Sequence, residues 1–600
     1  MNKLITNTLK ASILLLLILL NVSTFAQKLS YTVSIPEPQT HYCTVELKLE
    51  GIKKPAVDFK MPVWAPGSYL IREFPKNVEA ETAKDATGKA LKVQKADKNT
   101  WRVTLNGAET VVFSYQVYAF EHSVRTSFID ESHAFLNGGS IFMFPDGLLN
   151  LESTVIIKPF KNWQQISTSL EKVGGDKWTR KSPNFDILAD SPIEVGNHKI
   201  LEFTANNVQH YVAMYGEGAD YNPEQITKDL KKLTEEATKV FGENPAKDYT
   251  FFVHNVNQGG GGLEHLNSTA LIVERQRYDT QAGYLSFIGL AAHEYFHLWN
   301  VKRLRPTPLG PFDYSNENYT RQLWIAEGFT DYYDNLIPRR AGFTTDYAFL
   351  NAISDMINTH ENTGAKVQAL SEASFDAWIK HYRRNENSSN TMVDYYSSGA
   401  RVAAMFDLLI LNNSNGTKNL DDVMKMMYQE YYKKLNRPFT EDEFKKAVET
   451  VAGEKLDDFF QNSIYGTQKI DYNRFLGYAG LRMVEEKDDE VTLGARLEDT
   501  NGKIFVKGIT RGTAAEKYGL NVNDEVLGID GKRLSIGLLN QHISKKEVGD
   551  KITLLIARDG LIKSLEIVLG TSGRTNFQLR AVENPTEKQR MVLMRWIGNR

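Results

Sequence analysis

Apolar and polar residues alternate along short stretches in the first third of the chain. Tyr31–Ile35, Thr44–Leu49 and Thr110–Val117 all follow this period of two, which is typical of half-buried β-strands. We therefore expect residues 27–205 to form a β-sandwich domain. Inside this region, Trp64–Phe74 combines a Pro-Gly turn with aromatic residues, a composition that indicates a loop.

The apolar period becomes helical in the middle of the chain. An amphipathic helix is indicated by apolar residues at Ile226, Leu230, Leu233, Ala237 and Phe241. A short strand, Thr250–His254, follows this helix. Three further helices are predicted over Leu285–Trp299, Gln322–Leu336 and Gly399–Leu411. Residues 206–479 are therefore expected to form a mixed domain in which helices dominate.

Strand patterns return near the C-terminus. They cover Val491–Leu497, Lys503–Ile509 and Glu525–Lys532, so residues 480–575 are expected to form a small β-rich module. The tail, residues 576–600, has the composition of a short helix, with an apolar part made of Met591, Leu593, Met594 and Trp596. The predicted fold class is a multidomain α+β protein.

The first 26 residues have the pattern of a signal peptide. Ala11–Leu20 is almost wholly Leu and Ile, and Thr24, Phe25 and Ala26 precede a cleavage point before Gln27. An uncleaved anchor is the alternative, but the apolar run is short for a hydrocarbon core of about 30 Å. We expect a secreted protein, periplasmic in a bacterium, with no stable membrane span after cleavage.

Composition excludes two kinds of site. The formal net charge of −3 and the absence of a long basic stripe give no footprint for nucleic acid. Cys43 is the only cysteine, which rules out an intrachain disulfide and a Cys-based zinc site. Any metal site must therefore be built from histidine and carboxylate side chains.

The segment His293-Glu294-Tyr295-Phe296-His297 supplies such ligands. Residues four apart on a helix differ by about 40° in direction, so the two histidines can bind one zinc ion side by side. Glu294 points about 100° away and can reach the ion's water as a general base. A histidine pair without metal is the alternative. However, the helix is expected to be buried, because it carries an apolar stripe made of Leu285, Ile288, Ala292, Phe296 and Trp299. Two histidines on a buried helix need a polar partner, which a metal ion would provide.

A catalytic zinc site needs a third protein ligand and an open position for water. Glu327, thirty residues after His297 on the next predicted helix, is the candidate. Asp331 lies one turn further and is expected to hold the free N–H of a ligand histidine, most naturally His293. The alternative for Glu327 is a solvated glutamate.

A glycine-rich segment, Gln258–His265, follows a predicted strand. Glycines such as Gly261 and Gly262 allow another backbone to come close, so a peptide could pair along this edge. Without the zinc motif, the same segment would be read as a flexible turn.

Three of these elements together resemble the zinc aminopeptidases of the gluzincin group: Gly-x-x-Glu, His-Glu-x-x-His and Trp-x-x-Glu-Gly-Phe-Thr, in this order. The resemblance implies that Glu264 binds the free α-amine of the substrate. The group has Asn where this chain has His265, so the role of His265 stays open. The resemblance also implies an oxyanion-binding Tyr in a Tyr-x-x-Gly setting, which Tyr396 matches better than its neighbour Tyr395.

The chain more closely resembles the glycyl aminopeptidases of metallopeptidase family sixty-one. This resemblance rests on Trp64–Phe74, His293–Arg303 and the C-terminal module. It implies an N-terminal β domain, a thermolysin-like catalytic domain and a PDZ domain, with removal of N-terminal Gly and, less readily, Ala. The PDZ carboxylate loop would comprise Leu493, Gly494, Ala495 and Arg496, with the first helix opening at Gly512–Ala515.

The expected function is therefore a zinc-dependent aminopeptidase with one Zn²⁺ that releases small N-terminal residues from peptides with a free N-terminus. Two alternatives stay open: a PDZ-assisted zinc endopeptidase and a non-catalytic PDZ protein that binds peptides. Selectivity among Gly, Ala and acidic first residues is also open, as is whether the PDZ groove binds a C-terminal peptide or packs on the catalytic domain.

Overall fold

The computed structural model describes residues 27–598, which divide into two compact units. The first unit contains the described residues up to Val63 together with Glu73–Asn197. The second contains Trp64–Arg72 and the chain from His198 onward. The predicted signal peptide, residues 1–26, lies outside the described residues. Within the described part, no helix has the length and apolarity that a membrane span requires.

The first unit is built from two β-sheets and two short helices, α2 (Gly138–Ile141) and α3 (Phe185–Ala189). The eleven-stranded sheet has the order β10 (Phe144–Pro145), β3 (Ala56–Lys60), β6 (Thr100–Thr104), β5 (Ala90–Lys95), β4 (Val78–Asp85), β7 (Thr110–Tyr118), β2 (Tyr42–Glu50), β1 (Lys28–Ser34), β11 (Ser153–Lys158), β14 (Thr179–Ser182) and β13 (Glu171–Lys172). The four-stranded sheet has the order β12 (Gln165–Thr168), β15 (Ile193–Gly196), β9 (His133–Leu136) and β8 (Phe128–Ile129).

The period of two in the sequence is visible as alternating burial in β2. Cys43, Val45, Leu47 and Leu49 are buried, while the residues between them are not. β2 pairs antiparallel with β7 in the register Val45↔Tyr115, so the apolar side chains of both strands reach the same face. The β-rich fold expected for this region is confirmed.

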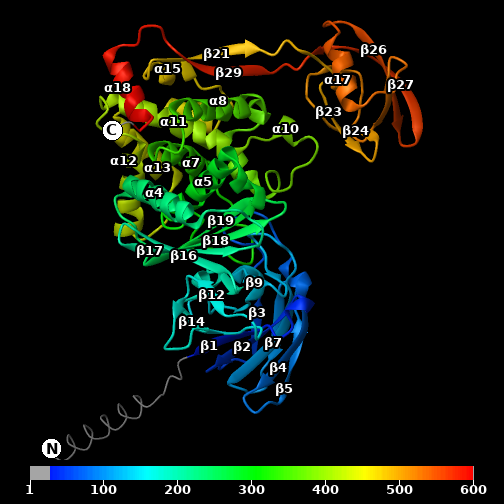
Figure 1. Cartoon of the computed structure of the whole chain (residues 1–600). Helices are drawn as coiled ribbons and strands as arrows, with labels where there is room; N and C mark the ends of the chain where they lie inside the picture. The colour runs from blue at the N-terminus through cyan, green and yellow to red at the C-terminus, as the bar shows by residue number, and fades with distance from the viewer. Residues whose placement is uncertain (1–26, 599–600) are drawn as a thin grey trace, which may run out of the picture. The chain divides into compact units, whose positions relative to one another are not determined.

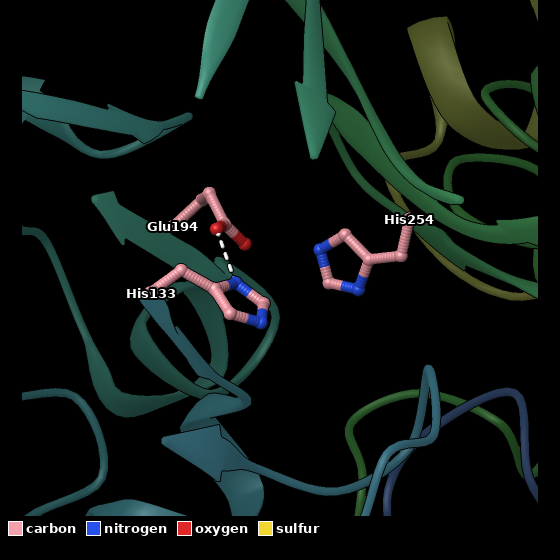
Figure 2. A group of neighbouring side chains, drawn as sticks. All are labelled: His133, Glu194 and His254. Carbon is pink, nitrogen blue, oxygen red and sulfur yellow. Dashed lines mark hydrogen bonds and ion pairs between the residues drawn. The ribbon is translucent and has the colours of Figure 1, made fainter. Parts of the chain in front are cut away.

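A buried polar pair links two strands of the smaller sheet. Nδ1 of His133 on β9 lies 2.7 Å from Oε1 of Glu194 on β15, and the side chains are 0% and 1% exposed. Figure 2 shows this hydrogen bond. The pair joins two adjacent strands of this sheet, so each buried polar side chain has a hydrogen-bond partner.

The second unit contains a five-stranded sheet in the order β16 (Lys199–Ala205), β17 (Val208–Tyr215), β18 (Asp248–Val256), β20 (Ser268–Glu274) and β19 (Gly261–His265). β19 is its edge strand and pairs antiparallel with β20. The domain boundary expected at residue 205 is therefore wrong, because β16 pairs with β17 along its whole length and belongs to the second unit.

Helices make up most of the rest of the second unit up to Gly477 (Figure 1). They are α4 (Pro223–Phe241), α5 (Gln281–Phe296), α6 (Leu323–Ala326), α7 (Gly328–Arg340), α8 (Asp346–Glu361), α9 (Leu370–Phe375), α10 (Ser388–Thr391), α11 (Tyr395–Asn413), α12 (Leu420–Met427), α13 (Glu441–Ala452), α14 (Asp457–Phe459) and α15 (Tyr472–Gly477). The single helix expected over Gln322–Leu336 is two helices that meet at Glu327.

The C-terminal module has one five-stranded sheet with a compact apolar core between Leu493 and Leu569. The sheet consists of β23 (Ala495–Thr500), β24 (Lys503–Ile509), β25 (Glu525–Ile529), β26 (Lys551–Arg558) and β27 (Leu561–Val568), and the module adds β22 (Val491–Thr492), β28 (Gly570–Thr571), α16 (Ala514–Lys517) and α17 (Ile536–Ser544). The strand expected over Val491–Leu497 is interrupted at Leu493 and Gly494.

Two further strands, β21 (Leu481–Lys487) and β29 (Thr575–Ala581), form an antiparallel ribbon beside the module. β29 is held on α8, because Asn358 bonds both backbone groups of Phe577 and Asn362 bonds both backbone groups of Thr575. The module proper is therefore narrower than the expected range 480–575.

The predicted tail helix exists as α18 (Glu587–Trp596). Its buried residues are Val592 and Trp596, whereas Met594, expected to be part of the apolar face, is 52% exposed. Trp596 is fully buried and its indole N–H donates to the hydroxyl of Tyr332 on α7 over 2.9 Å. The tail thus packs on a helix of the catalytic region.

Candidate metal centre and active site

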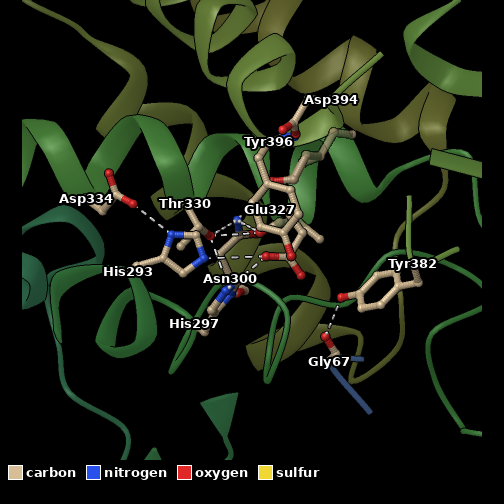
Figure 3. A network of polar contacts seen from close by, with 12 residues as sticks. Gly67, His293, His297, Asn300, Glu327, Thr330, Asp334, Tyr382, Asp394 and Tyr396 are labelled. Carbon is tan, nitrogen blue, oxygen red and sulfur yellow. Dashed lines mark hydrogen bonds and ion pairs between the residues drawn. The ribbon is translucent and has the colours of Figure 1, made fainter. Parts of the chain in front are cut away.

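The two histidines of the zinc motif lie near the end of α5, as the sequence predicts. Thr280 caps the start of this helix by accepting a hydrogen bond from the backbone N–H of Gly283. The rings of His293 and His297 lie side by side, with centroids 4.8 Å apart. Their Nε2 atoms lie 3.6 Å and 3.3 Å from Oε2 of Glu327. Figure 3 shows these three side chains together.

This donor set fits one zinc ion. Ligands at about 2.1 Å from a tetrahedral ion are separated from one another by about 3.4 Å, close to the distances from both histidines to Glu327. One donor atom from each of His293, His297 and Glu327 lies within 4.8 Å of the others. Two imidazoles and one carboxylate are the ligands of known catalytic zinc sites.

Glu327 occupies the break between α6 and α7. The side-chain amide of Asn300 donates to the carbonyl groups of Ile325 and Ala326 at 3.0 and 3.1 Å, which satisfies backbone acceptors at the end of α6. Burial raises the pKa of Glu327, but the neighbouring histidines outweigh burial and lower it to about 2. The carboxylate is therefore held in its charged form, as a metal ligand must be.

Two close backbone contacts fix α7 against α11. A Cβ on Gly328 would lie 2.5 Å from Cα of Gly399, so neither helix can carry a side chain at this crossing. The first turn of α11, with Tyr395 and Tyr396, is therefore brought beside Glu327 at the start of α7.

The outer nitrogens of both histidines have hydrogen-bond partners. Nδ1 of His293 lies 2.8 Å from Oδ2 of Asp334, and Nδ1 of His297 lies 2.8 Å from the carbonyl of Asn300. Both contacts leave the Nε2 atoms directed toward Glu327. Burial lowers the pKa of His293, but hydrogen bonds to Asp334 and Glu327 outweigh burial and raise it well above its usual value.

The assignment of Asp331 as the partner of His293 is therefore wrong. The helical turn from Glu327 to Asp331 is intact, because the backbone N–H of Asp331 donates to the carbonyl of Glu327 over 2.7 Å. It is nevertheless Asp334, about two turns after Glu327, that makes the hydrogen bond to His293. Asp331 still lies nearby, with a carboxylate oxygen within 4.8 Å of donor atoms of His293 and Asp334. Burial, and then the charge of Asp334, raise the pKa of Asp331 well above its usual value.

The candidate base, Glu294, is buried and lies against the edge strand β19. Burial, opposed by the two histidines and supported by Glu264 and Glu327, raises the pKa of Glu294 to about 7. A Cβ on Gly262 would overlap the carboxylate of Glu294. The glycine is therefore required for the close approach of β19 to the base.

Glu264 lies on the same strand, with its side chain only 4% exposed. Oxygens of Glu264 and Glu294 and a nitrogen of His297 all lie within 4.8 Å of one another. Among residues 27–598, Oε1 of Glu264 has no hydrogen-bond partner. Gly261 opens the strand with φ of +117°, and His265 ends it as a buried residue.

The structure distinguishes the two tyrosines. The ring of Tyr396 stacks on His293, with centroids 6.1 Å apart and planes inclined by 26°. Tyr395 is fully buried and packs on His381, and its hydroxyl has no hydrogen-bond partner in the described part of the chain. Burial, and then the charge of Glu327, raise the pKa of Tyr396 well above 10, so it can act as a hydrogen-bond donor.

In the C-terminal module, the first two residues of the predicted carboxylate loop precede β23, the edge strand of its sheet, and the last two begin that strand. Leu493 is buried in the apolar core, and Gly494 has φ of +78°. A Cβ on Gly494 would overlap the side chain of Thr513. Ala495 begins β23, and Arg496 donates to the carbonyl of Lys507.

Comparisons with known proteins agree with this architecture. Residues 30–197 match the M61 peptidase N-terminal domain, residues 286–402 match the M61 glycyl aminopeptidase domain, and residues 491–569 match a PDZ domain. The chain is a metallopeptidase, with two segments that match M61 domain models. His293, His297, Glu294 and Glu327 of this metallopeptidase all lie within residues 286–402, the range that matches the catalytic domain.

Among the proteins similar to this chain are two solved structures and one curated protein. An aminopeptidase N family protein from Idiomarina loihiensis is 28% identical, with a TM-score of 0.88 over 94% of this chain and 100% of that chain. An M1 zinc metallopeptidase from Deinococcus radiodurans is 10% identical, with a TM-score of 0.44 over 74% of this chain and 95% of that chain. The serine protease Do-like HtrA of Bacillus subtilis is 30% identical over 82 residues, which are 13% of this chain and only 18% of that protein.

Sequence reasoning missed the place of three features at this site: Asp334, Tyr382 and the loop Trp64–Arg72. Asp334 follows Glu327 by seven residues, about two helical turns, and this spacing could have identified it as a second candidate beside Asp331. Tyr382 had no signal in the sequence. The stretch Trp64–Phe74 stood out in the sequence, but its position at the site could not be predicted because it comes from a distant part of the chain.

Proposed function

We propose that this metallopeptidase is a zinc aminopeptidase that removes small residues from peptides with a free N-terminus. The observation that carries the proposal is the buried carboxylate of Glu264, whose Oε1 has no partner in the described residues and which lies beside Glu294 and His297. A buried anion without a partner is costly, and a substrate ammonium group would satisfy it by a charge-assisted hydrogen bond.

The metal would be held by His293, His297 and Glu327. When bound, zinc supplies Lewis-acid activation of water and of the scissile carbonyl group. Asp334 and the carbonyl of Asn300 keep both imidazoles in the tautomer that exposes Nε2.

The remaining side chains divide the proton transfer and charge stabilisation between them. Glu294, with its raised pKa, accepts a proton from the attacking water and delivers it to the leaving amine. Tyr396 keeps its phenolic proton and donates a hydrogen bond to the developing oxyanion. Glu264 fixes the amine, so that the first peptide bond is the one presented to Glu294. Edge strand β19 can pair with the extended substrate.

The test uses glycyl and alanyl p-nitroanilides, their N-acetylated forms and the full chain loaded with zinc. We expect turnover of the free-amine substrates alone, loss of activity with a chelator and recovery with zinc. Glu264→Gln should lower kcat/KM by roughly 30-fold or more, because loss of one partner of a buried charge pair costs about 2 kcal/mol or more. Glu235→Gln, at a half-exposed ion pair on α4, is the matched control.

Ready cleavage of acetylated peptides would reject the aminopeptidase proposal in favour of an endopeptidase. Retention of activity in Glu264→Gln would reject the role of this carboxylate. Absence of any peptidase activity in the zinc-loaded chain would favour a protein that only binds peptides.

We also propose that the PDZ module binds the C-terminus of a peptide, because the expected carboxylate loop leads directly into its edge strand β23. Calorimetry with a peptide and its C-terminal amide tests this proposal, since only the free carboxylate should bind.

Secretion, with cleavage before Gln27, is proposed from the sequence pattern and is tested by N-terminal sequencing of the mature protein.

A further inference from the structure

A loop from the N-terminal part of the sequence belongs to the active-site unit. Trp64–Arg72 interrupts the first unit and is part of the second. The indole N–H of Trp64 donates to the carbonyl of Asp313 over 2.7 Å, and its ring packs edge-on against Trp378 at 5.2 Å. Both rings are almost fully buried. The loop is therefore firmly attached to the catalytic region.

The turn of this loop meets the proposed amine site. The backbone N–H of Ser68 donates to the carbonyl of Ala65 over 2.9 Å, and Gly67 between them has φ of +89°. A Cβ on Gly67 would lie 2.7 Å from the carboxyl carbon of Glu264. Only a glycine allows the loop to approach this carboxylate so closely.

Aromatic residues support Gly67 from the other side. The hydroxyl of Tyr382 donates to the carbonyl of Gly67 over 3.4 Å, a contact that Figure 3 shows. The ring of Tyr382 packs edge-on against Tyr69 at 6.1 Å, and Tyr69 packs edge-on against Trp378 at 5.8 Å. Tyr69 is only 1% exposed. These rings are rigid and closely packed, so Gly67 and Tyr382 cannot easily move aside for a larger substrate side chain.

We infer that Gly67 and Tyr382 form the wall of the pocket for the substrate's first side chain, and that this wall limits the first residue to Gly or Ala. The inference rests on the proposed function, because it takes Glu264 as the amine site. The side chain of the first residue starts one atom away from its amine, so a wall that touches Glu264 also bounds the space for that side chain. A residue such as Leu would have to displace Tyr382 or the loop.

Acidic first residues are disfavoured by charge as well as by size. Their side-chain carboxylate would lie beside Glu264, with the carboxylates of Glu294 and Glu327 nearby. Like charges at such a separation repel each other strongly when they are buried. The order of preference inferred for the first residue is Gly and Ala, then larger apolar residues, and last Asp and Glu.

The test compares kcat/KM for glycyl, alanyl, leucyl and glutamyl p-nitroanilides in zinc-loaded variants. Tyr382→Ala should raise the ratio of leucyl to glycyl kcat/KM by about tenfold or more, because removal of steric exclusion by a few carbon atoms changes discrimination by about 10- to 200-fold. Tyr382→Phe retains the ring and should keep the ratio within about threefold of the original chain. Tyr347→Ala, at a side chain 74% exposed on α8, is the control for loss of a tyrosine elsewhere.

Zinc content and thermal melting are measured for each variant, and Tyr382→Leu replaces Tyr382→Ala if the latter does not fold. An unchanged leucyl-to-glycyl ratio in a folded, zinc-loaded Tyr382→Ala or Tyr382→Leu overturns the inference. A preference of the unsubstituted protein for leucyl over glycyl substrates also overturns the inference about the pocket wall, although the aminopeptidase proposal survives. If the unsubstituted protein turns over none of the free-amine substrates, both the aminopeptidase proposal and the inference about the pocket wall are rejected. Gly67→Ala should reduce kcat/KM for every free-amine substrate, because the added methyl group displaces Glu264.

Discussion

Asp334 on α7 accepts a hydrogen bond from Nδ1 of His293, and Nε2 of the same imidazole lies 3.6 Å from Glu327. One histidine is thus oriented by a carboxylate behind it and directed at a carboxylate in front of it. Such outer partners fix the tautomer of a metal-binding histidine and raise its basicity.

Zinc affinity should therefore depend on Asp334 rather than on Asp331. Asp334→Asn is expected to weaken zinc binding by about 10- to 100-fold, because the amide is a poorer acceptor for the His293 N–H. Asp331→Asn, the same change one turn away on α7, should alter the dissociation constant much less. Competition with a zinc-binding dye measures both constants, and a larger effect of Asp331→Asn would contradict this assignment.

Removal of the proposed base should abolish catalysis without loss of the metal. Glu294→Gln is expected to lower kcat by about 10²- to 10⁴-fold, the range for a general base. The amide fits the same space beside Gly262, so zinc content should stay at one ion per chain. Single-turnover rates and metal analysis test this expectation, and comparable activity in the variant would assign the proton transfer to another group.

The pH dependence of kcat/KM should follow the ionisation of Glu294. Its pKa is raised to about 7 by burial, and the added positive charge of a bound metal ion lowers the value. The base acts in its charged form, so kcat/KM should fall as the pH decreases through an apparent pKa at or below about 7. A profile that is flat from about pH 5 to 8 would rule out a base titrating in this range.

Tyr396 and Tyr395 should differ sharply in their effect on turnover. Tyr396→Phe is expected to lower kcat by about 10²-fold or more with little change in KM, because the lost donor acts mainly in the transition state. Tyr395→Phe removes a hydroxyl that has no hydrogen-bond partner in the described part of the chain and is the matched control. Steady-state kinetics of both variants decide the assignment, and a larger loss of kcat in Tyr395→Phe would reverse it.

The tail helix should contribute to the stability of the catalytic region. Trp596 is fully buried and donates to Tyr332 on α7, so Trp596→Ala should lower the free energy of unfolding by about 3–5 kcal/mol. Met594→Ala, at a residue 52% exposed, should change it by no more than about 0.5 kcal/mol. Urea denaturation followed by circular dichroism measures both, and equal effects would show that the tail does not dock as described.

Some of the site is determined by local sequence. His293 and His297 lie side by side because helical geometry alone places residues four apart on one face, and alternating strands such as β2 follow from their period of two. The glycines of β19 also indicate that the strand backbone lies very close to another group, which the structure shows to be the carboxylate of Glu294. These inferences need only a few neighbouring residues.

Tertiary structure decided the features that join distant segments. Whether Asp331 or Asp334 supports His293 depended on how α7 packs against α5, because both carboxylates lie within two helical turns of Glu327 and Asp334 makes the hydrogen bond. The contact between Gly67 and Tyr382 spans 315 positions. Such contacts have no sequence period, because they depend on how completed strands and helices pack together. The sequence alone therefore determined the helix of the proposed metal site, while packing decided which groups support the histidines and which form the wall of the proposed substrate pocket.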